Sequence, residues 1–118
     1  MKEQVKKLID NFAYFVIKQN ECLNKGDWKQ GNKYAKKYIK SFDEIRKIGD
    51  SVKEKMKKLL VHENDGIKVT AASFLLRYCT YEAMNVLKEI SKKPGIIGFE
   101  AQEFIKRWEE GSWSLNTD

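Results

Sequence analysis

The sequence predicts an all-α protein with about six helices in stacked antiparallel pairs. Apolar residues recur at helical spacing through most of the 118 residues, and Gly-Asp pairs interrupt this pattern twice. A segment of the second half also recurs further along the chain. No window shows the strict alternation of apolar and polar residues that is typical of a strand.

The segment 65–79, DGIKVTAASFLLRYC, is apolar around most of its circumference when it is drawn as a helix. Only Thr70, Ser73 and Arg77 form a polar stripe on it. A helix of this kind must be covered by neighbours on several sides. We therefore expect residues 65–79 to form the central helix, with Ala71 and Leu75 in the core.

The central segment recurs thirty residues later, and a repeat of this length with helical periodicity is typical of stacked helical hairpins. The corresponding pairs are Ile67 and Ile97, Val69 and Phe99, Ala71 and Ala101, Phe74 and Phe104, Leu75 and Ile105, and Arg77 and Arg107. The repeat predicts that the helix pairs stack side by side.

The six helices are expected at residues 2–24, 28–48, 51–61, 65–79, 81–93 and 99–110. Gly26-Asp27 and Gly49-Asp50 separate the first three, since glycine suits a helix C-terminus and aspartate can cap the next helix. We expect Asp65 and Thr80 to cap later helices. The segment 92–98, KKPGIIG, should end the fifth.

The length fits one domain, 1–118. We expect a long helical hairpin at 1–50, two short repeats at 51–111 and a loose tail at 112–118. No apolar run approaches the roughly 20 residues that a membrane span needs, and no signal-peptide pattern is present. Together with Cys22 and Cys79, which we interpret as reduced, buried thiols, this predicts a cytoplasmic protein with no membrane partner.

No residue pattern indicates an enzyme, a metal site, a cofactor or a small-molecule substrate. His62 is the only histidine, whereas zinc needs three or four ligands. We interpret it as a helix-end residue that bonds terminal carbonyls, with metal ligand or general base as the less favoured alternatives.

The net charge of +6 is concentrated in the first half. Residues 1–60 hold 16 Lys/Arg and 8 Asp/Glu, which gives +8, whereas residues 61–118 hold 7 and 9, which gives −2. A basic patch of Lys29, Lys33, Lys36 and Lys40 falls on one face of the second helix, beside Lys37. It is either a solvated surface or a footprint for an acidic partner or nucleic acid.

Aromatic residues are interleaved with these lysines, and aromatic rings can stack on bases. Trp28, Tyr38 and Phe42 share the inward stripe of the second helix, so core packing is the preferred interpretation for them. Gly31 lies on the same stripe and can permit a close helix contact. Only Tyr34 is left without a place in the core.

The run Leu59–Tyr78 resembles the HEAT-repeat pattern of Asp, Val-Arg and paired alanines, although Lys68-Val69 stands where Val-Arg would be. From Leu59 to Gly111 the chain also resembles a small bacterial family of HEAT-like helical domains. In that family a His-turn-Ala-Ala-Leu-Leu segment precedes a Gly-Phe-x-Ala helix that ends in Trp and Gly, as 98–101 and 108–111 do here. The resemblance implies a HEAT/ARM-like α-α superhelix.

Some members of this family look like immunity proteins, which are encoded beside polymorphic or contact-dependent growth-inhibition toxins. The resemblance therefore implies a non-catalytic protein-binding module that occludes the active site of a cognate toxin domain, often a nuclease, in the bacterial cytoplasm. The alternative is a nucleic-acid-binding HEAT-like domain that uses the basic patch.

Stacked helical pairs present a continuous surface built from the second helix of each pair, here the helices near 28–48, 66–79 and 99–110. The expected partner-binding positions on that surface are Lys33, Lys37, Thr70, Ser73, Arg77, Glu100, Glu103 and Arg107.

Overall fold

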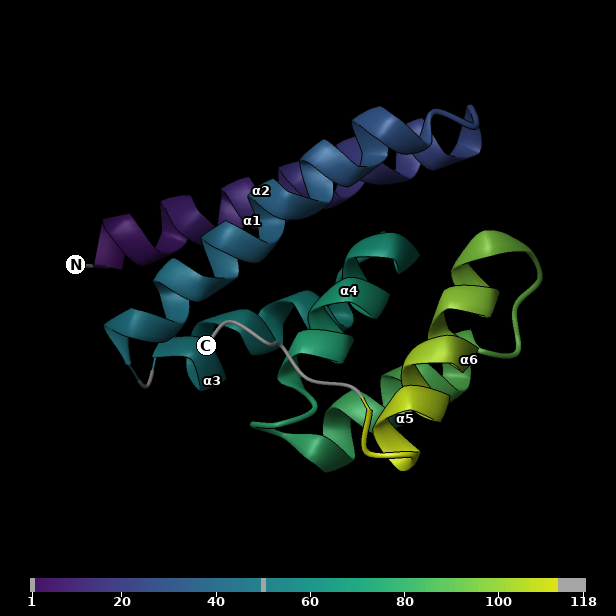
Figure 1. Ribbon diagram of the computed structural model, residues 1–118. Coiled ribbons are helices and arrows are strands. Elements are labelled where there is room, and N and C mark those ends of the chain that lie inside the picture. Colours follow the sequence, from purple (N-terminus) through teal and green to yellow (C-terminus); the bar gives the residue numbers. More distant parts are fainter. Residues whose placement is uncertain (1, 50, 113–118) are drawn as a thin grey trace. The chain divides into compact units, whose positions relative to one another are not determined.

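The computed structural model describes residues 2–49 and 51–112, and every regular element in these ranges is helical (Figure 1). The elements are α1 (Lys2–Asn24), α2 (Trp28–Ile48), α3 (Ser51–Met56), the 3₁₀ helix η1 (Lys57–Val61), α4 (Asp65–Leu75), α5 (Thr80–Ile90) and α6 (Gly95–Glu109). The all-α prediction is confirmed. The predicted tail lies outside the described residues, apart from Ser112.

The chain forms two compact units, residues 1–56 and 57–118, which we call unit 1 and unit 2. The division falls inside the predicted third helix, 51–61, where α3 gives way to η1. The prediction of one domain, with parts at 1–50, 51–111 and 112–118, stays a prediction. Each unit is described by itself below.

Unit 1 is built on α1 and α2, which lie side by side and run in opposite directions (Figure 1). Both helices have the predicted bounds. Gly26 has a φ of +78°, a left-handed conformation that glycine adopts without strain. An Asp27 carboxylate oxygen accepts a hydrogen bond from the backbone N–H of Gln30 at 3.1 Å, which confirms Asp27 as the cap of α2.

Aromatic packing holds this hairpin together. The Phe12 ring is fully buried and meets the Tyr38 ring edge-on, with centroids 5.6 Å apart, and the Phe42 ring at 6.4 Å. Gly31 is buried, and a Cβ atom placed there would lie 3.2 Å from a methyl carbon of Leu23. The predicted close contact at Gly31 is therefore confirmed.

Trp28 was expected on the inward stripe of α2, but its side chain is 62% exposed, so that prediction is wrong. It is the first residue of α2 and stands at the loop end of the hairpin, where α1 has already ended at Asn24. The apolar stripe of α2 includes Trp28 by its spacing, but α1, which covers the rest of that stripe, does not extend far enough to cover Trp28.

In unit 2, η1, α5 and α6 all contact α4. Every residue of α4 from Gly66 to Leu75 except Lys68 is buried, and Ala71 and Leu75 are fully so. The prediction of a central helix is confirmed, but α4 ends at Leu75, and residues 76–79 form a turn. Thr80 is the first residue of α5 and not its cap, and its hydroxyl donates to the Leu76 carbonyl at 2.6 Å. The cap position is held by Cys79, whose side chain makes no capping hydrogen bond.

The cap of α4 is Asn64, whose side-chain oxygen accepts a hydrogen bond from the Ile67 N–H at 3.0 Å. Asp65 was predicted in this role. It instead accepts a hydrogen bond from the Lys93 ammonium at 2.6 Å, and this bond lowers the pKa of its carboxyl group. The pair joins the start of α4 to the loop between α5 and α6.

The segment 92–98 also differs from the prediction, because α5 ends at Ile90 and α6 already begins at Gly95. Pro94 precedes the first turn of α6, a position where a missing N–H costs nothing. Gly98 is buried there, with the backbone carbonyl of Lys93 directly against it.

Replacing Gly98 by alanine should destabilise unit 2, because the new Cβ atom would overlap the Lys93 carbonyl oxygen. Overpacking of this kind costs about 1–3 kcal/mol of stability. The atom in the way belongs to the backbone, which cannot move aside as the end of a flexible side chain can. Chemical denaturation of G98A should show that loss. Lys106→Ala, at an exposed position of the same helix, is the control and should unfold like the wild type.

Replacing Leu75 or Ala71 by aspartate should unfold the protein or make it aggregate. Both side chains are fully buried, and an unpaired buried charge costs several kcal/mol. Circular dichroism melting of L75D and A71D tests this. A melting curve equal to that of the wild type would mean that α4 is not the core of unit 2.

Candidate functional site

The described residues contain no group of three His, Cys, Asp or Glu side chains that could share a metal ion. His62 is exposed, and its Nδ1 accepts a hydrogen bond from the Asn64 N–H at 2.9 Å. The prediction that His62 bonds the terminal carbonyls of its helix is therefore wrong. The ring instead accepts from the backbone of the turn that follows it. Cys22 is a half-buried thiol and Cys79 a buried one.

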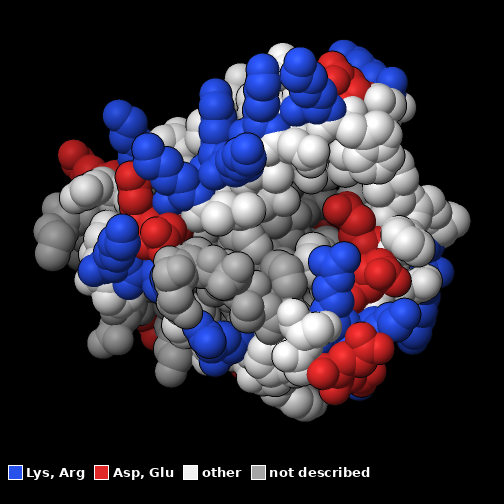
Figure 2. Space-filling view, viewed as in Figure 1, with Lys and Arg blue, Asp and Glu red and all other residues white. Residues whose placement is uncertain are grey.

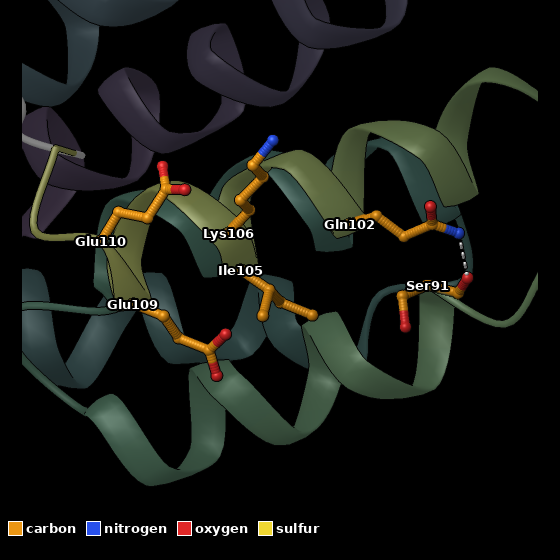
Figure 3. Close-up of a pocket in the computed structure, with 6 residues that line it drawn as sticks. All are labelled: Ser91, Gln102, Ile105, Lys106, Glu109 and Glu110. Atoms are coloured by element: carbon orange, nitrogen blue, oxygen red, sulfur yellow. Dashed lines mark hydrogen bonds between the residues drawn. The ribbon is translucent and has the colours of Figure 1, made fainter.

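A pocket of about 450 Å³ lies where the end of α5 meets α6 (Figure 3). It is lined by Ser91, Gln102, Ile105, Lys106, Glu109 and Glu110. The Gln102 amide closes one end by donating to the Ser91 carbonyl at 2.9 Å. Lys106 and Glu110 point to one side of α6, and Glu109 points to the other. The pocket therefore does not bring its charged groups together on one reacting atom.

Five lysines of α2 form the strongest charged surface of unit 1, which we call the lysine face: Lys29, Lys33, Lys36, Lys37 and Lys40. All five are exposed, and they lie on the side of α2 away from the buried Phe42 and Ile45. In Figure 2 a row of basic side chains follows the hairpin. Within the described chain, none of the five forms an ion pair.

An aromatic cluster borders the lysine face and links the two helices of the hairpin. The rings of Phe15 and Tyr34 stack with centroids 6.4 Å apart, and the Lys37 ammonium lies 5.5 Å from both. Tyr14 meets Phe15 edge-on at 5.6 Å and is 53% exposed. Lys18 lies 5.9 Å from the Tyr14 centroid.

Of this cluster, the sequence pattern singles out only Tyr34. Tyr14 and Phe15 were missed. Tyr14 falls outside the apolar stripe that contains Phe12 and Val16, whereas Phe15 lies at the edge of that stripe, seven residues after Leu8. An aromatic residue off the buried stripe was the signal that could have found Tyr14. The pairing with Tyr34 needs the register of α1 against α2, which the pattern of one helix does not contain.

In unit 2, one side of α6 combines exposed apolar and charged side chains. This α6 outer face consists of Ile96, Phe99, Glu103, Lys106 and Arg107 of the helix and of Glu110 at its C-terminal cap, at helical spacing. Glu103 is half-buried and the other five are exposed. Phe99 is 61% exposed and Ile96 40%. No charged side chain of α6 forms an ion pair among the described residues.

The predicted partner-binding residues are spread over several environments. Lys33 and Lys37 are exposed on α2, Arg107 is exposed on α6, and Arg77 is exposed in the turn after α4. Glu103 is half-buried on α6. These residues keep side chains that a partner could reach.

Three of the predicted positions are less accessible. Thr70 and Ser73 are buried, at 6% and 1% exposure, and the Ser73 hydroxyl donates to the Thr70 carbonyl at 2.7 Å. Both side chains are therefore covered by the fold, although their stripe on α4 is polar in sequence. Glu100 is half-buried, and this burial raises the pKa of its carboxyl group.

Among the described residues, no helix is both long and apolar enough to cross a membrane.

The candidate surfaces are the lysine face with its aromatic border in unit 1 and the α6 outer face in unit 2. Comparisons of the chain with protein-family models, with curated proteins and with solved structures found no match.

Proposed function

We propose that this chain is a non-catalytic protein-binding module, an immunity protein that binds a cognate bacterial toxin domain and occludes its active site. The observation that carries the proposal is the α6 outer face, where Phe99 and Ile96 are exposed beside charged groups that have no internal partner. Residues 59–111 also resemble a small bacterial family of HEAT-like domains, some members of which look like immunity proteins, and this resemblance suggests a toxin domain as the partner.

The α6 outer face has the ingredients of a protein interface. Interfaces rest on a few large anchors that become fully desolvated, surrounded by polar groups that exclude water. Phe99 and Ile96 can supply such anchors. Glu103, Lys106 and Arg107 lie on the same side of the helix and can pair with charges of a partner, which favours specificity and fast association.

We also propose that the helix pairs of unit 2 repeat in the manner of HEAT repeats. The support is the helix register: α4 begins at Asp65 and α6 at Gly95, thirty residues later, as the sequence repeat requires. Ala71 and Ala101 occupy matching positions and are both fully buried. In such a stack α6 is the second helix of its pair, and its outer side belongs to the binding surface.

Changing Phe99 to alanine together with Arg107 to glutamate should abolish protection against the toxin without unfolding the chain. The change removes one exposed anchor and reverses one exposed charge, so the loss should exceed tenfold in affinity. The assay co-expresses the chain with the C-terminal domain of a secreted protein encoded in the adjacent reading frame, and follows cell growth.

Tyr81→Ala with Lys88→Glu is the matched control, because it changes an exposed aromatic residue and an exposed lysine of α5. This variant should protect as well as the wild type. If the α6 variant also protects fully, the toxin binds elsewhere. If no adjacent domain is toxic, or if the wild-type chain does not protect against it, the immunity function is refuted.

The lysine face favours a second candidate function, the binding of nucleic acid. Five exposed ammonium groups without ion pairs form one charged strip on a helix that contains no acidic residue before Asp43. A strip of this kind attracts the phosphate backbone irrespective of sequence.

If the lysine face binds phosphates, affinity for random DNA or RNA should fall steeply with salt. Five contacts to a single strand correspond to a slope of about −3.5 in a plot of log affinity against log salt. Changing Lys29, Lys33, Lys36 and Lys40 to glutamate should abolish binding, as measured by fluorescence anisotropy. Absence of binding by the wild type at low salt would discard this candidate.

A further inference from the structure

We propose that unit 1 is a platform for single-stranded nucleic acid, on which bases stack against Tyr14 and Tyr34 while the lysine face holds the phosphates. The inference rests on the second candidate function and goes further, because it names the strandedness of the ligand and the side chains that contact its bases.

The aromatic cluster and the lysine face form one connected surface. Lys37 belongs to the lysine face, and its ammonium lies 5.5 Å from the ring centroids of both Phe15 and Tyr34. From Phe15 the contacts continue to the Tyr14 ring at 5.6 Å, and from Tyr14 to the Lys18 ammonium at 5.9 Å. The surface thus alternates between cations and rings as it passes from α2 to α1.

The cluster is not an extension of the hydrophobic core. Tyr14 keeps 53% of its surface exposed, and Phe15 and Tyr34 are half-buried, whereas Phe12 and Val16 on the adjoining side of α1 are completely buried. The outer rings therefore remain partly uncovered where the lysines are. A ring surface in that position can still be covered by a flat ligand.

The lysine face has the length to follow a strand. Lys29 and Lys40 are eleven residues apart, which corresponds to roughly 16 Å along the axis of α2. That length spans several phosphates. On the other side of the rings the Lys18 ammonium is already paired with the Glu21 carboxylate at 3.4 Å, so the lysines of α2 supply the phosphate contacts. A backbone bound along α2 can therefore turn its bases toward Tyr34 and Tyr14.

The chemistry favours a single strand over a duplex. In a duplex the base faces are already stacked on one another, so only phosphates and groove edges are available to an outer helix surface. Unpaired bases expose their faces, and stacking on an aromatic side chain is worth ~1–3 kcal/mol per base with little dependence on sequence. Lysines supply the sequence-independent charge attraction that such binding also needs.

Fluorescence anisotropy with three labelled ligands of ~20 nucleotides tests the platform: an oligothymidylate strand, an abasic strand with the same number of phosphates, and a duplex. The oligothymidylate should bind about 5-fold or more tightly than the abasic strand. Tyr14→Ala should remove most of this preference and Tyr14→Phe should retain it. Y81A, at a 78% exposed tyrosine in unit 2, is the control and should bind like the wild type.

The outcomes separate the platform from the basic surface beneath it. If the abasic strand or the duplex binds the wild type as tightly as the oligothymidylate does, the platform is overturned but the phosphate-binding lysine face stands. If Y14A and a folded Y34A both keep the preference for bases, the cluster is not the stacking site, and the platform is likewise overturned. If no ligand binds at low salt, both proposals fail. Thermal melting shows that each variant is folded.

Discussion

The structure of unit 2 depends on the burial of α4, because a helix that is apolar on nearly all sides cannot face water. Its neighbours η1, α5 and α6 each contact α4. Two ion pairs across unit 2 accompany this packing: Lys93 with Asp65 at 2.6 Å, and Lys57 of η1 with Glu82 of α5 at 2.8 Å. Both pairs are partly exposed, so they add little stability beside the hydrophobic contacts.

Unit 1 follows a different principle, since its two long helices bury one side and leave the other to solvent. Lysines four residues apart on α2 repel one another by a few tenths of a kcal/mol per pair. Burial of Phe12, Val16, Phe42 and Ile45 is worth several times that cost. The hairpin can therefore carry a lysine face that an isolated helix of the same sequence would tolerate poorly. Charge is left unpaired there at the same time as aromatic rings are left partly uncovered, which is why a surface function is the natural hypothesis.

The two candidate surfaces share one property, an excess of polar groups that the fold itself does not use. On α1, α2 and α4, several charged residues pair within their own helix, as Lys6 does with Asp10 and Arg46 with Asp43. On α6 and along the lysine face, no such pairs form among the described residues. Unused charge is available for a partner at no cost to internal contacts. The two surfaces differ in their apolar component: flat rings border the lysine face, whereas Phe99 and Ile96 stand out from α6.

The sequence by itself determined the helical class, the bounds of α1 and α2, the cap at Asp27 and the central place of α4. These features depend on local propensity and on a periodicity that one helix contains in full. Only the tertiary structure decided that α6 begins at Gly95, that Thr70 and Ser73 are buried, and that Trp28 is exposed. Each of these depends on what lies opposite a residue: the Lys93 carbonyl against Gly98, the cover over the polar stripe of α4, and the end of α1 short of Trp28. The Phe15–Tyr34 stack has the same origin, because the register between two helices is fixed by their interlocking side chains and not by the pattern of either one.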